Sequence, residues 1–143
     1  MMEKKLTGQE KRVVEILSKQ ERVKLAYLFG SVARGKEGKL SDLDLAVFLD
    51  ESLSKKERFN LQIALISEIS SILKTDNVDL VVMNDASLSL NYEIIKSNHP
   101  LFVRDKIQKI DLEHKILSRY LDRRYYEKRS ADIFLRKVAK GGL

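Results

Sequence analysis

Three short runs of apolar residues constrain the fold of this chain more than any other sequence feature. They lie at Val23–Phe29, Leu43–Leu49 and Val78–Met83, and each has the length of a typical β-strand. Gly30 stops the first run, and two acidic residues stop the second. A fourth, shorter run at Leu101–Arg104 follows a turn and indicates a brief edge strand. Together the runs predict a β-sheet.

The segments between these runs carry the start signals and the spacing of helices. Thr7-x-x-Glu10 and Ser54-x-x-Glu57 match the capping box, in which two residues satisfy each other's backbone N–H groups. Each precedes apolar residues at helical spacing, so we expect two amphipathic helices, and the apolar stripe of the second should cover the sheet.

Two further helical segments are expected later in the chain. Asp85 stands where it would cap a helix that runs through Ile95. From Ile107 onward the apolar spacing predicts one long helix, or two, ending at Gly141 and Gly142.

Composition limits the classes of protein and of metal site. A chain of 143 residues has the usual size of one domain. It lacks a run of about 18 apolar residues and an apolar stretch after its first charges, so we expect no membrane span, no signal peptide and a cytoplasmic location. It has no cysteine, and its two histidines, His99 and His114, are isolated. Any metal ion would therefore be held mainly by carboxylates.

The net charge of +6 comes from the C-terminal end of the chain. Residues 1–114 carry 18 basic and 18 acidic groups, whereas residues 115–143 carry nine basic and three acidic groups. Tyr120, Tyr125 and Tyr126 lie among these basic residues. A partner protein, RNA or an acidic membrane patch would suit such a segment, and so would a solvated helix face. No RNA-binding module is recognisable, so nucleic acid is not the expected partner.

The segment between the first two apolar runs carries the motif on which the functional prediction depends. Gly30-Ser31 follows the first run, ten residues intervene, and Asp42-Leu43-Asp44 opens the second. Gly30 permits a sharp turn, and Ser31 then begins a helical turn whose N–H groups and hydroxyl can bind a phosphate. Because side chains alternate along a strand, Asp42 and Asp44 project from one face, with about 7 Å between their Cα atoms.

Two neighbouring carboxylates repel each other unless a cation lies between them, and a site made only of oxygen ligands favours Mg²⁺ or Mn²⁺. Asp79, inside the third apolar run, would complete a three-carboxylate cluster if that strand lies beside the second. It would then orient or deprotonate the attacking oxygen. The alternative is an ordinary acidic residue at a strand edge.

The connecting segment also contains polar residues that can reach a triphosphate. Arg34 follows Ser31 by about one helical turn, while Lys39 and Ser41 are candidate phosphate ligands. Lys39 can equally be a solubilising loop charge, and Ser41 can stabilise a turn. The segment from Gly30 also matches most of a P-loop, but Glu37 stands where a P-loop needs Ser or Thr, and this excludes that alternative.

The stretch Gly30–Asp44 resembles the GS-x10-DxD signature of the DNA polymerase β-like nucleotidyltransferase superfamily. The resemblance implies an α+β fold with a mixed β-sheet flanked by helices, a nucleotidyltransferase core over residues 1–104 and a basic helical extension of the same domain over 105–143. It also implies that Gly30 and Ser31 contact the triphosphate, that Asp42 and Asp44 bind the metal ions, and that Asp79 lies beside the acceptor oxygen.

The size of the chain is similar to that of minimal nucleotidyltransferases, the MNT antitoxins paired with HEPN ribonuclease toxins. This resemblance implies ATP as the donor and a tyrosine of the HEPN toxin as the acceptor of AMP. A homodimer and a hetero-oligomer both stay open, because the sequence does not determine the oligomeric state. Two alternatives stay open. One is a small-molecule nucleotidyltransferase like the aminoglycoside-modifying enzymes, and the other is a non-catalytic antitoxin that acts by binding alone.

Overall fold

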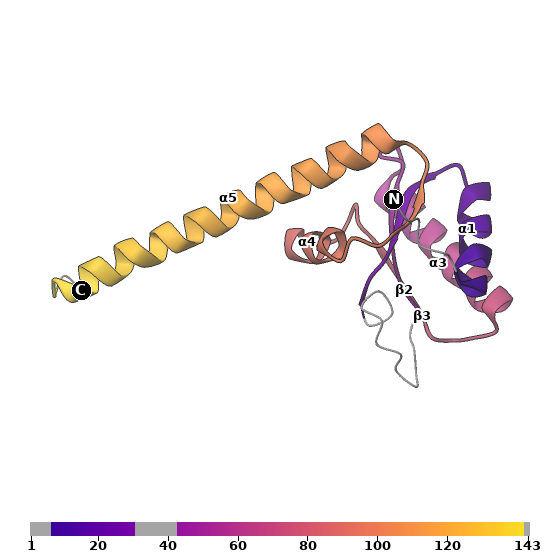
Figure 1. Cartoon of the computed structure of the whole chain (residues 1–143), viewed down its shortest axis with the longest axis horizontal. Helices are drawn as coiled ribbons and strands as arrows, with labels where there is room; N and C mark the ends of the chain where they lie inside the picture. The colour runs from indigo at the N-terminus through magenta and orange to yellow at the C-terminus, as the bar shows by residue number, and fades with distance from the viewer. Residues whose placement is uncertain (1–6, 31–42, 142–143) are drawn as a thin grey trace.

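A computed structural model of the chain describes residues 7–30 and 43–141 (Figure 1). Its helices are α1 (Gly8–Lys19), α3 (Lys55–Leu73), α4 (Leu88–Lys96) and α5 (Lys106–Ala139). Its strands are β1 (Val23–Leu28), β2 (Leu43–Leu49), β3 (Val78–Val82) and β4 (Pro100–Val103). The expected α+β class is confirmed.

The four strands form one mixed sheet in the order β3-β2-β1-β4. β1 is antiparallel to both β2 and β4, whereas β2 and β3 are parallel and are joined through α3. A parallel neighbour needs such a crossover, since a tight hairpin turn can only reverse the chain. In the β2–β3 register, Asp44 lies opposite Asp79.

Helices cover both faces of the sheet (Figure 1). On one face, α1 and α3 bury Leu17, Leu65 and Ile69 against β-strand residues such as Leu45. On the other face, which we call the α4 face, the buried side chains come from the sheet, α4 and the first half of α5; they include Tyr27, Phe48, Met83, Ile94 and Ile116. The alternation of side chains along β2 explains how one strand contributes to both clusters.

Both predicted capping boxes are present. The Thr7 and Ser54 hydroxyls each accept a hydrogen bond from the backbone N–H of the glutamate three residues later, at 3.1 Å in both cases. Glu10 and Glu57 accept in return from the backbone N–H groups of the capping residues. These exchanges satisfy donors that a helix N-terminus would otherwise leave unpaired.

The predicted cap of α4 was wrong. Ser87 is the N-cap, and its hydroxyl accepts from the N–H of Leu90 at 3.1 Å. Asp85 instead pairs with Arg58 of α3, at 2.7 Å between Oδ1 and Nη2. A hydrogen bond and the charge of Arg58 lower the pKa of the Asp85 carboxyl. The Arg58 guanidinium donates one charge-assisted hydrogen bond to each oxygen of the Asp85 carboxylate. These two bonds are stronger than the hydrogen bond that a helix-capping role would provide.

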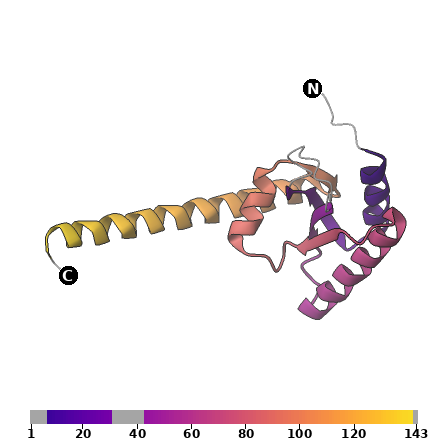
Figure 2. The same ribbon diagram turned by 90° about the horizontal axis from the view of Figure 1, so that it is seen from below.

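α5 is a single helix of 34 residues, about 51 Å long at 1.5 Å per residue. Asp105 caps its start, and it ends shortly before Gly141, which has a φ of +67°. Its first half crosses the α4 face, and the rest extends away from the sheet (Figures 1 and 2). None of the helices within the described ranges is long and apolar enough to cross a membrane.

Candidate active site

Asp44 and Asp79 lie side by side on neighbouring parallel strands. They are register partners at the N-terminal ends of β2 and β3, where strands are separated by about 4.8 Å. Both belong to the α4 face, since Ala46 and Val81, two residues further along each strand, pack in that cluster. Asp44 is half-buried and Asp79 is exposed. The neighbouring strands on which the predicted cluster depended are therefore present.

Gly30 brings the backbone directly against the Asp44 carboxylate. Its φ is +77°, a conformation that glycine adopts without steric cost. A Cβ at this position would overlap Oδ2 of Asp44. Just before it, the N–H of Phe29 donates to the Asp44 carbonyl at 3.1 Å. The turn after β1 and the second acid of the DxD motif thus form one compact unit.

The segment after α4 holds the same end of β1 in place. The N–H of Leu28 donates to the carbonyl of His99 at 3.0 Å, and the Ser97 hydroxyl lies 3.4 Å from the Leu28 carbonyl. Asn98 between them has a φ of +52°, in agreement with the predicted turn. Sequence reasoning gave Ser97 and His99 no role at this site, because nothing in their local sequence reveals a contact about 70 residues away in the chain.

The remaining predicted residues, Ser31, Arg34, Lys39, Ser41 and Asp42, lie outside the residues that the structure describes. Their expected roles stay predictions. Within 7–30 and 43–141, no three acidic or histidine side chains are grouped closely enough to hold a metal ion. Asp44 and Asp79 nevertheless supply two hard oxygen donors at adjacent positions, which suits Mg²⁺ or Mn²⁺ if Asp42 adds a third.

A buried tyrosine connects this sheet to α5. Tyr27 is 1% exposed, and its hydroxyl donates to Oε2 of Glu113 at 2.7 Å. Lys109 neutralises the same carboxylate, with 3.0 Å between Nζ and Oε2. Burial, together with the hydrogen bond and negative charge of Glu113, raises the pKa of Tyr27 well above its ordinary value. No local sequence pattern indicates this network, because Tyr27 and Glu113 are 86 residues apart.

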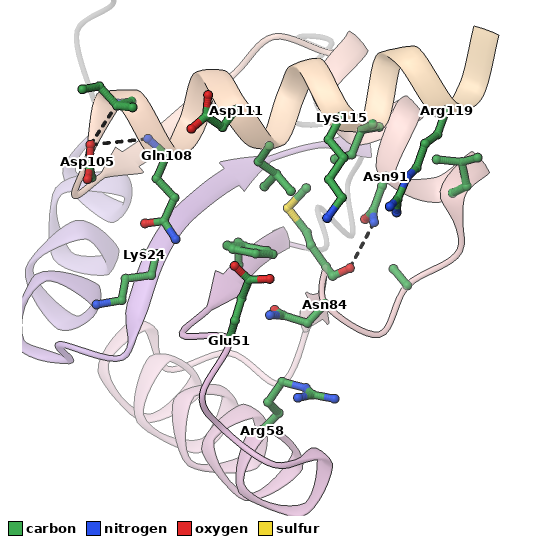
Figure 3. A pocket seen from close by; sticks show the side chains of 17 residues that line it. Lys24, Glu51, Arg58, Asn84, Asn91, Asp105, Gln108, Asp111, Lys115 and Arg119 are labelled. Atoms are coloured by element: carbon green, nitrogen blue, oxygen red, sulfur yellow. Dashed lines mark hydrogen bonds between the residues drawn. The ribbon is translucent and has the colours of Figure 1, made fainter. Parts of the chain in front are cut away.

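A cavity of about 980 Å³ lies at the opposite end of the α4 face (Figure 3). Phe48 and Met83 line its interior, and Lys115 and Arg119 reach toward it from α5. Phe48 lies four residues beyond Asp44, or about 13 Å along the strand. The cavity and the acidic pair are therefore two separate places on one face.

Residues 11–107 match the family model described as polymerase beta, nucleotidyltransferase. The chain belongs to this nucleotidyltransferase family. The matched range contains β1, the connection to β2, and β3, and hence Gly30, Asp44 and Asp79.

A curated relative is the protein adenylyltransferase MntA of Shewanella oneidensis, which is 30% identical over 94 residues. The alignment covers 65% of this chain and 64% of MntA, so the match extends over somewhat less than two thirds of that relative's length.

Solved structures of toxin–antitoxin complexes show the same fold. The MntA–HepT complex contains a chain with a TM-score of 0.64 and 23% identity, covering 89% of this chain and 97% of that one. A toxin–antitoxin complex with AMP-PNP gives a TM-score of 0.67 and 24% identity, covering 88% and 98%. A complex of tri-AMPylated HEPN toxin with MNT antitoxin, from Shewanella oneidensis, gives 0.62 and 22%, covering 89% and 96%.

Proposed function

We propose that this chain is a divalent-metal-dependent nucleotidyltransferase that transfers AMP from ATP to a tyrosine of a partner HEPN-type toxin. The observation that carries the proposal is the pairing of Asp44 with Asp79 beside the turn at Gly30, in a chain of the nucleotidyltransferase family. The donor, the acceptor and the toxin partner are supported by what the relatives are called, an adenylyltransferase and complexes of an AMPylated HEPN toxin with its antitoxin.

Each residue has a physical task in this reaction. Backbone N–H groups after Gly30, with Ser31, would orient the triphosphate, because such groups at a turn into a helix bind anions. Asp42 and Asp44 would hold Mg²⁺, which when bound neutralises charge on the triphosphate. Asp79, the more exposed of the two described acids, would accept the proton of the acceptor hydroxyl.

AMP transfer is a single displacement at phosphorus, in which one bond forms and one bond breaks. The tyrosine oxygen forms a bond to the α-phosphorus of ATP, and the bond from that phosphorus to the α,β-bridging oxygen breaks. Pyrophosphate leaves with the electron pair, and the tyrosine proton passes to Asp79. The products are AMP-tyrosine and pyrophosphate.

The direct test combines the purified chain, Mg²⁺, one NTP at a time, and the purified product of the neighbouring gene, which the proposal expects to be a HEPN-type toxin. We expect ATP to raise the intact mass of the toxin by whole AMP units, and peptide mapping to place them on tyrosine. Asp44→Asn should reduce transfer by about 1,000-fold or more, because it removes a metal ligand in a site that acts through charge stabilisation. Asp76→Asn, an exposed acid in the turn before β3, is the matched control.

Equal transfer by wild type and Asp44→Asn would reject the proposed role of the acidic pair. Modification of a small-molecule hydroxyl instead of the toxin would favour the aminoglycoside-type alternative. Full protection of cells by Asp44→Asn would favour an antitoxin that acts by binding alone.

A further inference from the structure

We propose that Leu117–Ala139, here called the outer segment of α5, is a docking helix for a partner protein whose matching surface is apolar and acidic. This inference rests on the proposed function only in taking the acceptor to be a protein. It adds the surface that binds the partner, which lies outside the proposed catalytic residues.

The first observation is the exposure of large apolar side chains along the outer segment. Eight of them expose 42–66% of their surface: Leu117, Leu121, Tyr125, Tyr126, Ile133, Phe134, Leu135 and Val138. The only residue that α5 buries is Ile116, just before the segment begins. Tyr120 and Arg123 contact α4, but none of the residues beyond them is buried, so the end of this helix lacks the tertiary packing on which most helices in proteins depend.

The aliphatic members of this set form a line along the helix. Leu117 and Leu121 are four residues apart, Leu135 follows Leu121 by two heptads, and Val138 follows by three residues. Spacings of three, four and seven place side chains on one face of a helix. The same line starts beside α4, where Ile110 and Leu117 border a small groove with Tyr92. A continuous apolar stripe of this kind suits another helix or an apolar groove.

The second observation is charge, and it identifies the type of occupant. Leu117–Ala139 contains seven basic and three acidic residues, and two of the basic ones, Arg124 and Lys128, interrupt the apolar stripe at its heptad positions. A second copy of this chain would bring like charges together along the stripe, which costs free energy. An acidic partner surface would pair with them. The phosphates of RNA would satisfy the charges but leave the leucines uncovered, so a protein surface fits better.

The third observation is that α5, including the first residues of the outer segment, is firmly attached to the rest of the domain. Tyr120 stacks on Tyr92 of α4, with 3.7 Å between ring centroids and 2° between ring planes. The bond from Tyr27 to Glu113 joins the same helix to β1. Both contacts lie on the face that carries Asp44 and Asp79, and the outer segment extends from this side (Figure 1). A partner held on the outer segment is therefore held in a defined position relative to the acids.

The test measures binding to the purified HEPN-type toxin by calorimetry, without ATP, for variants that keep the helix. Leu121→Glu with Leu135→Glu should weaken binding by about 100-fold or more, because two apolar contacts are replaced by charges facing an acidic surface. Phe59→Glu with Ile63→Glu on α3 is the matched control, since these two apolar side chains are similarly exposed and lie outside the proposed docking helix. It should change affinity by less than about fivefold.

Binding by Leu121→Glu with Leu135→Glu at wild-type affinity would overturn the proposal, provided that circular dichroism shows an unchanged helix content. Self-association of the wild-type chain that this pair abolishes would also overturn it, in favour of a second copy. Tighter binding to a single-stranded RNA oligonucleotide than to the toxin would overturn it in favour of nucleic acid.

Failure of the proposed function gives a different result. Suppose that Leu121→Glu with Leu135→Glu no longer binds the toxin, and that the wild type leaves the toxin unmodified in the presence of ATP and Mg²⁺. This pair of results would support the docking helix and reject AMP transfer. Asp44→Asn should bind the toxin with wild-type affinity, because Asp44 lies on β2 and not on α5.

Discussion

The sheet body and the outer segment of α5 use similar apolar residues in opposite ways. In the body, Leu17, Leu45 and Leu65 are at most 2% exposed. In the outer segment, Leu121 and Leu135 are 53% and 61% exposed. Burial depends on whether a second layer covers the residue. The sheet has helices on both faces, whereas nothing within the described chain covers the end of α5.

Charge separates the same two regions. Basic and acidic groups balance over residues 1–114, and the excess of basic groups lies in residues 115–143. This balance in the body and the basic, apolar outer segment agree with our proposal that folding and partner binding belong to different parts of the chain. Substitutions in the body and in the outer segment should therefore have separable effects on stability and on partner binding.

The largest effect is expected from removing a core leucine. Leu45→Ala should lower the free energy of unfolding by about 2–5 kcal/mol, since it deletes a fully buried side chain and leaves a cavity. Leu135→Ala should change it by less than about 0.5 kcal/mol, since that side chain already contacts water. Urea titration measures both. Similar losses in the two variants would show that the outer segment is packed in the isolated chain.

Gly30→Ala should reduce AMP transfer by about 100-fold, because the new Cβ would displace the Asp44 carboxylate from its position and reacting groups tolerate little misplacement. Its affinity for the toxin should be unchanged, whereas Leu121→Glu with Leu135→Glu should lose affinity. Gly8→Ala is the control, because a Cβ there meets no atom within 4 Å. A Gly30→Ala protein that transfers AMP at the wild-type rate would separate the turn from the chemistry.

Tyr27 should make the body sensitive to alkaline pH. Its pKa is raised in the folded protein, so the stabilisation is complete below the ordinary tyrosine pKa of about 10 and is lost as the pH rises beyond it. The loss from this one group should approach about 1.4 kcal/mol per pH unit. The free energy of unfolding should be measured at several pH values around this pKa, from about 9 to about 11. It should fall less steeply with pH for Tyr27→Phe than for Tyr125→Phe, in which an exposed ring is changed. Equal slopes would contradict a raised pKa of Tyr27 in the folded protein.

The smallest effect is expected from shortening the chain after Leu121. This variant keeps Ile116 and the stack of Tyr120 on Tyr92, so its unfolding free energy should lie within about 1 kcal/mol of the full chain. A chain ending at Arg104 should be clearly less stable, because the α4 face would lose its cover from Leu112 and Ile116. This outcome fits the prediction that residues 105–143 extend the same domain. Calorimetric melting compares the three proteins.

Much of the fold was predictable from local signals. Both capping boxes act within four residues of sequence, and the three strand-length runs needed no distant partner to be recognised. The error at Asp85 has the opposite origin. Its side chain had two possible uses, and the choice between capping α4 and pairing with Arg58 depended on where α3 lies.

The candidate site shows the same limit. The motif that starts at Gly30 predicted a nucleotidyltransferase, the family to which the chain belongs, and the side of the sheet on which Asp44 lies followed from strand geometry. Whether Asp79 would lie beside Asp44 was a question of strand order, which the α3 crossover decides.

The amino-acid sequence by itself determined the starts of α1 and α3, the strand segments, the acidic motif and the basic C-terminal segment, because each follows from the chemistry of neighbouring residues. Only the tertiary structure decided that Asp79 lies beside Asp44, that Tyr27 bonds to Glu113, and that the end of α5 stays uncovered. These features depend on contacts between residues far apart in the chain, and the packing of helices on the sheet selects those contacts.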